Sequence, residues 1–380
     1  MRIGITCHPS AGGSGIMATE LGLALAARGH EIHFVTDEMP YRLTGFHENV
    51  MSHRVEMVSY PLFRSPPLSL ALASRICDVA EENAIELWHA HYAMPNAVAA
   101  LIARDMLPPA QRFKLVTTLH GTDITLVGTD PMFYRVTRHA MQQSDAVTAV
   151  SNWLTEETRR EFNLDAPVQT IYNFLDPDKF NTPPVSKCNF VKDDERLVMH
   201  ISNFRPVKRV TDVIRVFKRI ADHVPARLVM VGEGPERMAA VGVAKQLGIA
   251  DRVRYIGNHE SIEELLPCAD LVFQPSEHES FGLVPLEAMA CGVPVLGTNS
   301  GGVTEVVEHG VTGCLCEVGD IEAMTKCALE VLTDPEKARQ MGARGRERAL
   351  THFRRDDIVR QYEALYERVL AGSLAAAASA

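Results

Sequence analysis

The strongest constraint on the fold is a regular alternation of short apolar runs with segments of helical periodicity, which occurs twice along the chain. Such alternation is typical of parallel β-sheets whose two faces are covered by helices. A polar segment from Asp176 to Asp194 interrupts the alternation once. We therefore expect an α/β protein with two Rossmann-like, doubly wound domains joined by this segment.

The expected elements follow from these patterns. In the first half we expect strands near residues 2–7, 31–36, 55–60, 85–90, 114–119, 146–151 and 168–172, with helices at 14–28, 68–83, 95–106, 131–143 and 153–162. In the second half we expect strands at 196–202, 227–231, 253–257, 271–274, 293–297 and 313–317. The expected domains are 1–175 with a returning helix at 354–370, and 176–353, followed by a disordered tail at 371–380.

Length, charge and cysteine usage exclude several classes of protein. A chain of 380 residues suits two domains, and a net charge of -10 argues against a nucleic-acid-binding surface. No apolar run is long enough to span a bilayer, and because a strand is expected from residue 2 we expect no signal peptide. The eight scattered cysteines are interpreted as reduced thiols of a cytoplasmic protein. The oligomeric state is left open.

The most informative block for function covers residues 279–305. Glu279 is followed eight positions later by Glu287, and Gly282 with Leu283 is expected to open a helix between them. The N–H groups at a helix start and the helix dipole form an anion site. We interpret the block as a nucleotide-diphosphate-sugar site in which both carboxylates hold hydroxyl groups. Because two glutamates at this spacing also occur in ordinary helices, the interpretation depends on the whole block.

This block resembles the Glu-x7-Glu motif of the retaining glycosyltransferases of family 4, which have the GT-B fold. The resemblance implies two Rossmann-like domains facing a central cleft, with the acceptor bound by the first and the nucleotide sugar by the second. It also implies retention at the anomeric carbon without a protein nucleophile, so that the departing β-phosphate accepts the proton of the acceptor. The catalytic residues that we expect are Glu279, His120, Lys208 and Arg205.

The donor-binding residues are expected mainly in the second domain. Arg205 and Lys208 follow a strand and are suited to pair with a diphosphate. Family members commonly have Gly-Arg-Leu at positions 202–204, so the departure here makes Lys208 the stronger phosphate ligand. Glu279 is expected to hold the sugar hydroxyls and Glu287 the ribose. The full donor-binding set is Gly13, Asn203, Arg205, Lys208, Gly232, Asn258, His259, Glu279, Phe281, Gly282, Leu283 and Glu287.

The acceptor-binding residues are expected in the first domain. The glycine-rich turn at 9–15 is not Gly-x-Gly-x-x-Gly, so a dinucleotide-binding dehydrogenase is the weaker interpretation. His120 ends an apolar strand and precedes a glycine, and the resemblance implies that it donates to a sugar hydroxyl. Arg138 is also open to interpretation as a solvated helix charge. The expected acceptor-binding residues are Ser14, Tyr92, Thr118 and Arg138.

We predict no metal and no cofactor. His89 and His91 point the same way on a strand, but no third ligand is evident near them. Asp176 and Asp178 match the Asp-x-Asp of metal-dependent transferases only superficially, because they lie in a turn-rich segment where a turn role is expected.

Further segments resemble one subgroup of family 4 over residues 1–370, among them 3–7, 116–124 and 200–205. This resemblance implies UDP-N-acetylglucosamine as the donor and the 2-hydroxyl of L-malate as the acceptor, as in the first step of bacillithiol synthesis. Three alternatives stay open: a transferase with another anionic acceptor such as an inositol phosphate, a UDP-N-acetylglucosamine 2-epimerase, and a non-catalytic nucleotide-sugar sensor.

Overall fold

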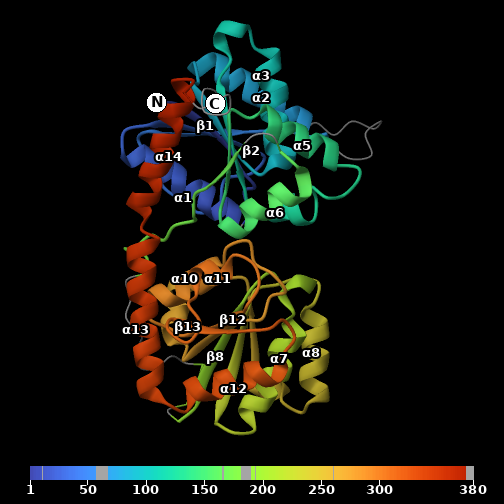
Figure 1. Cartoon of the computed structure of the whole chain (residues 1–380), viewed down its shortest axis with the longest axis vertical. Helices are drawn as coiled ribbons and strands as arrows, with labels where there is room; N and C mark the ends of the chain where they lie inside the picture. Colours follow the sequence, from blue (N-terminus) through green and yellow to red (C-terminus); the bar gives the residue numbers. More distant parts are fainter. Residues whose placement is uncertain are drawn as a thin grey trace. The chain divides into compact units, whose positions relative to one another are not determined.

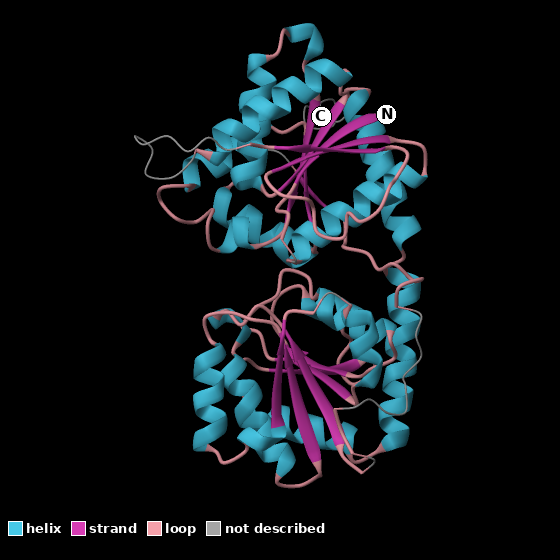
Figure 2. Cartoon of the chain, turned by 180° about the vertical axis from the view of Figure 1, so that it is seen from behind, coloured by secondary structure: helices cyan, strands magenta, loops and turns pink. Residues whose placement is uncertain are grey.

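The computed structural model describes residues 1–10, 12–56, 67–164, 167–180, 190–192, 194–259 and 261–373. The chain divides into two compact units, which we call unit 1 (Met1–Asn173 and Arg355–Ala380) and unit 2 (Phe174–Arg354). Each unit has one parallel sheet with helices on both faces (Figures 1 and 2). The predicted fold class, two doubly wound α/β sheets, is confirmed.

The sheet of unit 1 has seven parallel strands in the order β3-β2-β1-β4-β5-β6-β7. Their bounds are β1 Arg2–Thr6, β2 Glu31–Thr36, β3 Val50–Arg54, β4 Leu87–His91, β5 Lys114–Leu119, β6 Ala146–Ala149 and β7 Val168–Thr170. The strand order reverses between β1 and β4, which pair directly. In open sheets of this kind ligands bind at the carboxyl ends of the strands at such a switch point.

The helices of unit 1 cover both faces of this sheet (Figure 1). They are α1 Gly13–Ala27, α2 Leu68–Asn83, η1 Ala93–Ala97, α3 Val98–Met106, η2 Pro109–Gln111, α4 Thr122–Thr125, α5 Tyr134–Gln143, α6 Asn152–Phe162 and α14 Arg355–Leu370. The core includes the fully buried Trp88, whose indole N–H donates to Thr6 Oγ1 at 2.7 Å. Gly4 makes room for this ring, because a Cβ there would lie 2.3 Å from Trp88.

Most of the strand expected at 55–60 lies outside the described part of the chain, because only Val55 and Glu56 of it are described. The structure places β3 at Val50–Arg54, and the N–H of Val55, just after it, donates to Thr36 O of β2 at 2.9 Å. The prediction followed apolar residues, whereas β3 is an edge strand of mixed, partly exposed residues. Edge strands pack on fewer neighbours, so their hydrophobic pattern is weak.

The sheet of unit 2 has six parallel strands in the order β10-β9-β8-β11-β12-β13, and its switch point lies between β8 and β11. The strands are β8 Arg196–Ile201, β9 Ala226–Val231, β10 Val253–Gly257, β11 Leu271–Gln274, β12 Val295–Thr298 and β13 Gly313–Cys316. The helices are η3 Pro206–Lys208, α7 Val210–Ala221, α8 Arg237–Gln246, η4 Ala250–Arg252, α9 Ile262–Leu265, η5 Leu266–Cys268, α10 Leu283–Ala290, α11 Val303–Val306, α12 Ile321–Leu332 and α13 Pro335–His352.

The helix expected at 354–370 is α14, which packs beside α1 in unit 1 (Figure 1). Its Glu363 accepts two hydrogen bonds of 2.8 Å from Arg28 and one of 3.0 Å from His30. Of the tail expected at 371–380, residues 374–380 lie outside the described part. Among the described residues, no helix is both long and apolar enough to cross a membrane.

Candidate functional site

Two loops meet at the switch point of unit 2. Lys208 lies at the end of the loop that follows β8, and its Nζ donates to Glu279 Oε1, in the loop after β11, at 2.7 Å. Ser276 Oγ donates to the same carboxylate oxygen at 2.7 Å. The backbone joins the loops as well, because Glu277 N donates to Val207 O at 2.8 Å. The two residues singled out for the sugar and the phosphate therefore form an ion pair.

Electrostatics keep Glu279 ionised. Burial alone would raise the pKa of this carboxyl, but the charge of Lys208 and the hydrogen bonds from Lys208 and Ser276 outweigh burial and lower it. His200 lies close by, bonded through Nδ1 to Phe273 O and through Nε2 to Ser202 Oγ, each at 2.8 Å. Burial lowers the pKa of His200 to about 4, so this ring is neutral at pH 7.

Gly301 and Gly302, in the loop after β12, pack directly against the loop that contains Glu279. Gly302 N donates to Glu279 O at 2.7 Å, and Gly301 forms an isolated β-bridge with Glu279. At Gly301 φ is +76°, and an added Cβ would lie 2.4 Å from Glu279 O. Only glycine allows both the left-handed conformation and this close approach.

The turn after β9, formed by residues 232–235 with the sequence Gly-Glu-Gly-Pro, lies against the loop that contains Asn203. An added Cβ at Gly232 would lie 1.8 Å from Ser202 O, and one at Gly234 would lie 2.1 Å from Asn203 O. Gly232 N also donates to Gly257 O at 2.7 Å, which brings the exposed Asn258 and His259 to the same edge of the sheet. Five loops that the sequence singled out thus gather at the carboxyl edge of one sheet.

Helix α10 adds an anion-attracting end. It begins at Leu283 after Gly282, whose φ is +102°, so its first N–H groups have no acceptor within the helix. Glu287 lies one turn further on and is buried. Phe281 packs its ring on Phe353 with 5.6 Å between centroids, so the contribution of this side chain is to anchor the helix start.

At the switch point of unit 1 three rings pack together. Tyr92 follows β4, and its ring packs edge-on against His8, which follows β1, at 4.9 Å, and stacks on His120 at 5.4 Å. Tyr92 has φ of 85°, a strained value for a non-glycine residue. Its N–H donates to Thr118 O at 2.9 Å. His8 belongs to this cluster although sequence reasoning did not single it out.

Behind these rings lies a buried hydrogen-bond network. His91 Nδ1 lies 2.9 Å from His120 Nε2, and His89 Nε2 lies 2.6 Å from Thr118 Oγ1. Tyr366 of α14 reaches His89 Nδ1 at 2.7 Å. Burial lowers the pKa of His89 and of His120 to about 3, and that of His91 well below its usual value. All three imidazoles are therefore neutral at pH 7.

Asp123 fixes the strand ends that carry these rings, and sequence reasoning missed it. Its carboxylate accepts from the backbone N–H groups of His120 at 3.1 Å, Gly121 at 2.8 Å and Ala93 at 3.1 Å. Burial raises its pKa to about 6 in spite of these bonds. The signal in the sequence is local: an acid four positions after the end of β5, in the first turn of the short helix α4.

The structure gives no support for two of the expected acceptor contacts. Thr118 is completely buried, and its hydroxyl is bonded to His89 and, at 2.6 Å, to Thr148. Arg138 donates from Nε to Phe162 O at 2.9 Å and from Nη2 to Asn163 O at 3.1 Å, which caps the end of α6. Both side chains are engaged in the scaffold. Ser14 and the exposed Gly13 lie in the first turn of α1.

The residues considered for metal binding are engaged otherwise. Asp178 N donates to Asp176 Oδ1 at 3.1 Å, which is a turn bond within the Asp-x-Asp segment. Within the described ranges no cluster of three or more His, Cys, Asp or Glu side chains could hold a metal ion. A metal-free reaction remains a prediction.

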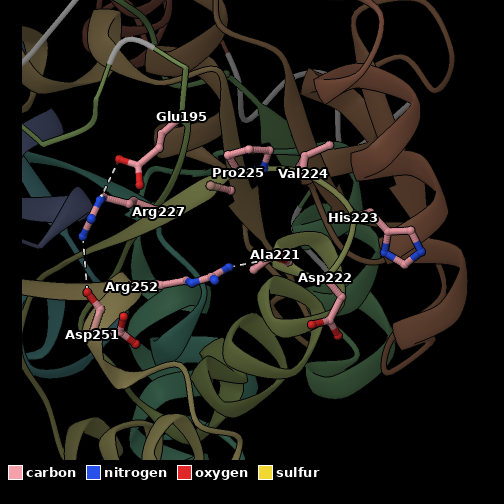
Figure 3. A pocket seen from close by; sticks show the side chains of 10 residues that line it. Glu195, Ala221, Asp222, His223, Val224, Pro225, Arg227, Asp251 and Arg252 are labelled. Carbon is pink, nitrogen blue, oxygen red and sulfur yellow. Dashed lines mark hydrogen bonds and ion pairs between the residues drawn. The ribbon is translucent and has the colours of Figure 1, made fainter.

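A hollow of about 490 Å³ lies at the opposite, amino edge of the unit 2 sheet (Figure 3). Its cationic side chains already have partners, since Arg227 pairs with Glu195 at 2.8 Å and Arg252 donates to Ala221 O at 3.1 Å. This hollow contains none of the expected site residues.

Comparisons with known proteins decide the family. Residues 11–179 match the family described as Glycosyltransferase Family 4, and residues 185–348 match Glycosyl transferases group 1. The N-acetyl-alpha-D-glucosaminyl L-malate synthase of Bacillus anthracis is 47% identical over 373 residues, which cover 97% of each chain. The chain belongs to glycosyltransferase family 4. The resemblance drawn from the Glu279–Glu305 block is thereby confirmed.

Solved structures agree with a family 4 fold. Sucrose-phosphate synthase from Thermosynechococcus elongatus has a TM-score of 0.80 at 23% identity, covering 98% of this chain and 100% of that one. Anabaena Alr3699/HepE in complex with UDP and glucose has a TM-score of 0.78 at 21% identity, covering 97% of this chain and 99% of that one. At these identities the likeness shows the fold alone. The roles of individual residues in this family 4 glycosyltransferase remain predictions.

Proposed function

We propose that this glycosyltransferase transfers N-acetylglucosamine from UDP-N-acetylglucosamine to the 2-hydroxyl of L-malate with retention, releasing UDP in the cytoplasm. The observation that carries the proposal is the 47% identity with the Bacillus anthracis synthase over 97% of both chains. The matched length extends over both units, the expected acceptor-binding unit as well as the donor-binding unit. The free cysteines among the described residues support a reducing compartment.

The donor role rests on the ion pair of unit 2. Lys208 and the N–H groups at the start of α10 are proposed to bind the diphosphate, and Arg205 to assist them. Glu279, held by Lys208 and Ser276, is proposed to orient the sugar hydroxyls, with Glu287 on the ribose. As the glycosidic bond to UDP breaks, negative charge grows on the β-phosphate, and losing one stabilising donor typically raises the barrier by about 3 kcal/mol.

The acceptor role rests on the ring cluster of unit 1. Tyr92 and the backbone N–H groups of Gly13 and Ser14 are proposed to bind malate, and neutral His120 to donate to a sugar hydroxyl. The malate 2-hydroxyl forms the new bond to the anomeric carbon on the face from which UDP departs. Its proton goes to the departing β-phosphate oxygen, so no protein nucleophile or base is required.

The direct test is to incubate the protein with UDP-N-acetylglucosamine with and without L-malate and to identify products by mass. We expect N-acetylglucosaminyl malate and UDP only when malate is present, with an α-anomeric linkage by NMR. Donor turnover at the same rate without malate would indicate an epimerase or hydrolase. UDP-sugar binding with no product would indicate a sensor, and preference for an inositol phosphate over malate would indicate another acceptor.

A second test concerns the metal. Activity should be unchanged in excess EDTA, because Lys208 supplies a positive charge where a divalent ion would otherwise neutralise the diphosphate. Loss of turnover with EDTA that magnesium or manganese restores would contradict this assignment.

A further inference from the structure

His91 lies directly behind the histidine proposed to contact the sugar. Its Nδ1 is 2.9 Å from His120 Nε2, and its side chain is only 1% exposed. The other ring nitrogen, Nε2, is buried and has no hydrogen-bond partner among the described residues. Among the described residues, the buried ring of His91 therefore makes one hydrogen bond, and that bond joins it to His120.

Only two proton arrangements satisfy this pair. Both rings are neutral at pH 7, because burial lowers their pKa values, so each ring carries one proton. In the first arrangement His91 donates from Nδ1–H, and the proton of His120 is on its own Nδ1. In the second, His120 donates from Nε2–H, and the proton of His91 is on its buried Nε2.

The unpartnered Nε2 of His91 discriminates between the two proton arrangements. The second arrangement buries an N–H group without an acceptor, and buried N–H groups without partners are rarer than unsatisfied acceptors. The first arrangement leaves a lone pair at that position and needs no buried unpaired donor. It also leaves Nδ1–H of His120 available as a donor.

Neighbouring residues fix the position of the His120 ring, so that the hydrogen bond from His91 determines which nitrogen of His120 carries the proton. Asp123 accepts from the backbone N–H groups of His120 and Gly121, and Tyr92 stacks on the ring. We propose that His91 is a positioning residue that sets the tautomer of His120, so that His120 presents Nδ1–H to a hydroxyl oxygen of the donor sugar. This inference rests on the proposed function only for the identity of the sugar.

The tautomer can be measured without any substrate. Two-bond ¹⁵N–¹H spectra of the full chain labelled at histidine, with His120→Gln to assign the signals, report which nitrogen is protonated. We expect His120 protonated on Nδ1 with Nε2 bare. A proton on Nε2 of His120 in the wild-type protein would overturn the proposal, whatever reaction the enzyme catalyses.

Matched variants test the consequence for turnover. In His91→Asn the side-chain amide nitrogen takes the place of Nδ1 and can still donate, whereas in His91→Gln it is one bond further out. We expect His91→Asn to keep kcat within about threefold, and His91→Gln to lose on the order of tenfold or more in kcat with little change in the KM for malate. Equal kcat for the two folded variants, whether retained or lost, would overturn the proposal.

The two proposals fail in different ways. If wild-type protein makes no N-acetylglucosaminyl malate but the spectra show the expected tautomer, the proposed function is wrong and the positioning role stands. If wild-type protein makes the product but the tautomer is reversed, only the role of His91 is wrong. Circular dichroism of each variant establishes that it is folded before its kinetics are compared.

Discussion

The two sheets place chemically different groups at the same topological position. Between β1 and β4 of unit 1 the loops bring His8 against Tyr92, while between β8 and β11 of unit 2 they join Lys208 to Glu279. One switch point is neutral and aromatic, and the other is an ion pair. A shared architecture thus fixes where a ligand binds, and the loop residues decide which chemical groups it meets.

The two positions also differ in how their polar groups are supported. In unit 1 the His89, Thr118 and Tyr366 side chains bond to one another inside the core, whereas the side chains of Lys208 and Glu279 keep 19% and 18% of their surface exposed. We therefore expect substitutions at the unit 2 position to change turnover most, and substitutions of His89, Thr118 or Tyr366 in unit 1 to change stability most.

The largest expected effect is that of Glu279→Gln. The substitution keeps the shape but removes the charge, so kcat should fall by about 10²–10³-fold. The dissociation constant for UDP should stay constant or decrease, because Lys208 no longer shares its charge with a carboxylate. Steady-state kinetics and calorimetry measure both, with the exposed neighbour Glu277→Gln as control. A wild-type kcat, or a UDP affinity that falls as far as kcat, would contradict the comparison.

A smaller effect is expected for Gly301→Ala. An alanine there combines left-handed strain of about 1–2 kcal/mol with overlap against Glu279 O, so the Glu279 loop must move. We expect a loss in kcat on the order of tenfold. Gly310→Ala is the matched control, because its φ of +75° is nearly the same and nothing lies within 4 Å of an added Cβ. If both variants lose equal activity, strain alone explains the loss.

The stability of the two units should depend differently on pH. A histidine whose pKa is about 6.5 in the unfolded chain and lower in the folded protein decreases the free energy of unfolding as pH falls from 6.5 towards 3. The reason is that the unfolded state binds a proton that the folded state does not bind. Unit 1 has His8, His53, His89, His91 and His120 in this class, and unit 2 has His200. Asp123, with its pKa raised to about 6, offsets about one proton between pH 6 and 4.

Hydrogen exchange at pH 7.5 and 5.5, corrected for intrinsic rates, gives the opening free energy of each unit. We expect β4 and β5 of unit 1 to lose about 1 kcal/mol per histidine at the lower pH, and more in total than β8 of unit 2. Equal losses in both units would show that the buried histidines do not govern the difference.

The smallest expected effect on kcat is that of Tyr366→Phe, which should change stability instead. Removing the hydroxyl leaves His89 Nδ1 without its partner in the core, which should lower the free energy of unfolding by about 1–3 kcal/mol. The kcat should change less than twofold, because Tyr366 supports the network from α14 and is not proposed to touch substrate. Denaturant unfolding and kinetics measure the two quantities. A kcat loss comparable to that of Glu279→Gln would contradict the expectation that Tyr366 contributes to stability and not to turnover.

The same contrast explains what the sequence could predict. Most of the proposed unit 2 site comes from local segments with strong signals, the glycine turns and the Glu279–Glu287 spacing, so its residues can be proposed from the sequence. The unit 1 network joins His89 to Tyr366 across 277 positions, and no local pattern encodes that pairing. Thr118 and Arg138 have polar side chains suited to a ligand, but tertiary partners engage them in the scaffold.

Because α14 packs in unit 1, unit 2 can finish folding before unit 1 does during synthesis. The ribosome delivers the strands of unit 1 first and all of unit 2 next, and α14 emerges after both. Until then Arg28 lacks Glu363 and His89 lacks Tyr366, so the earliest part of the chain is the last to reach its final free energy. A nascent chain arrested before α14 would therefore hold a folded unit 2 beside an unfinished unit 1.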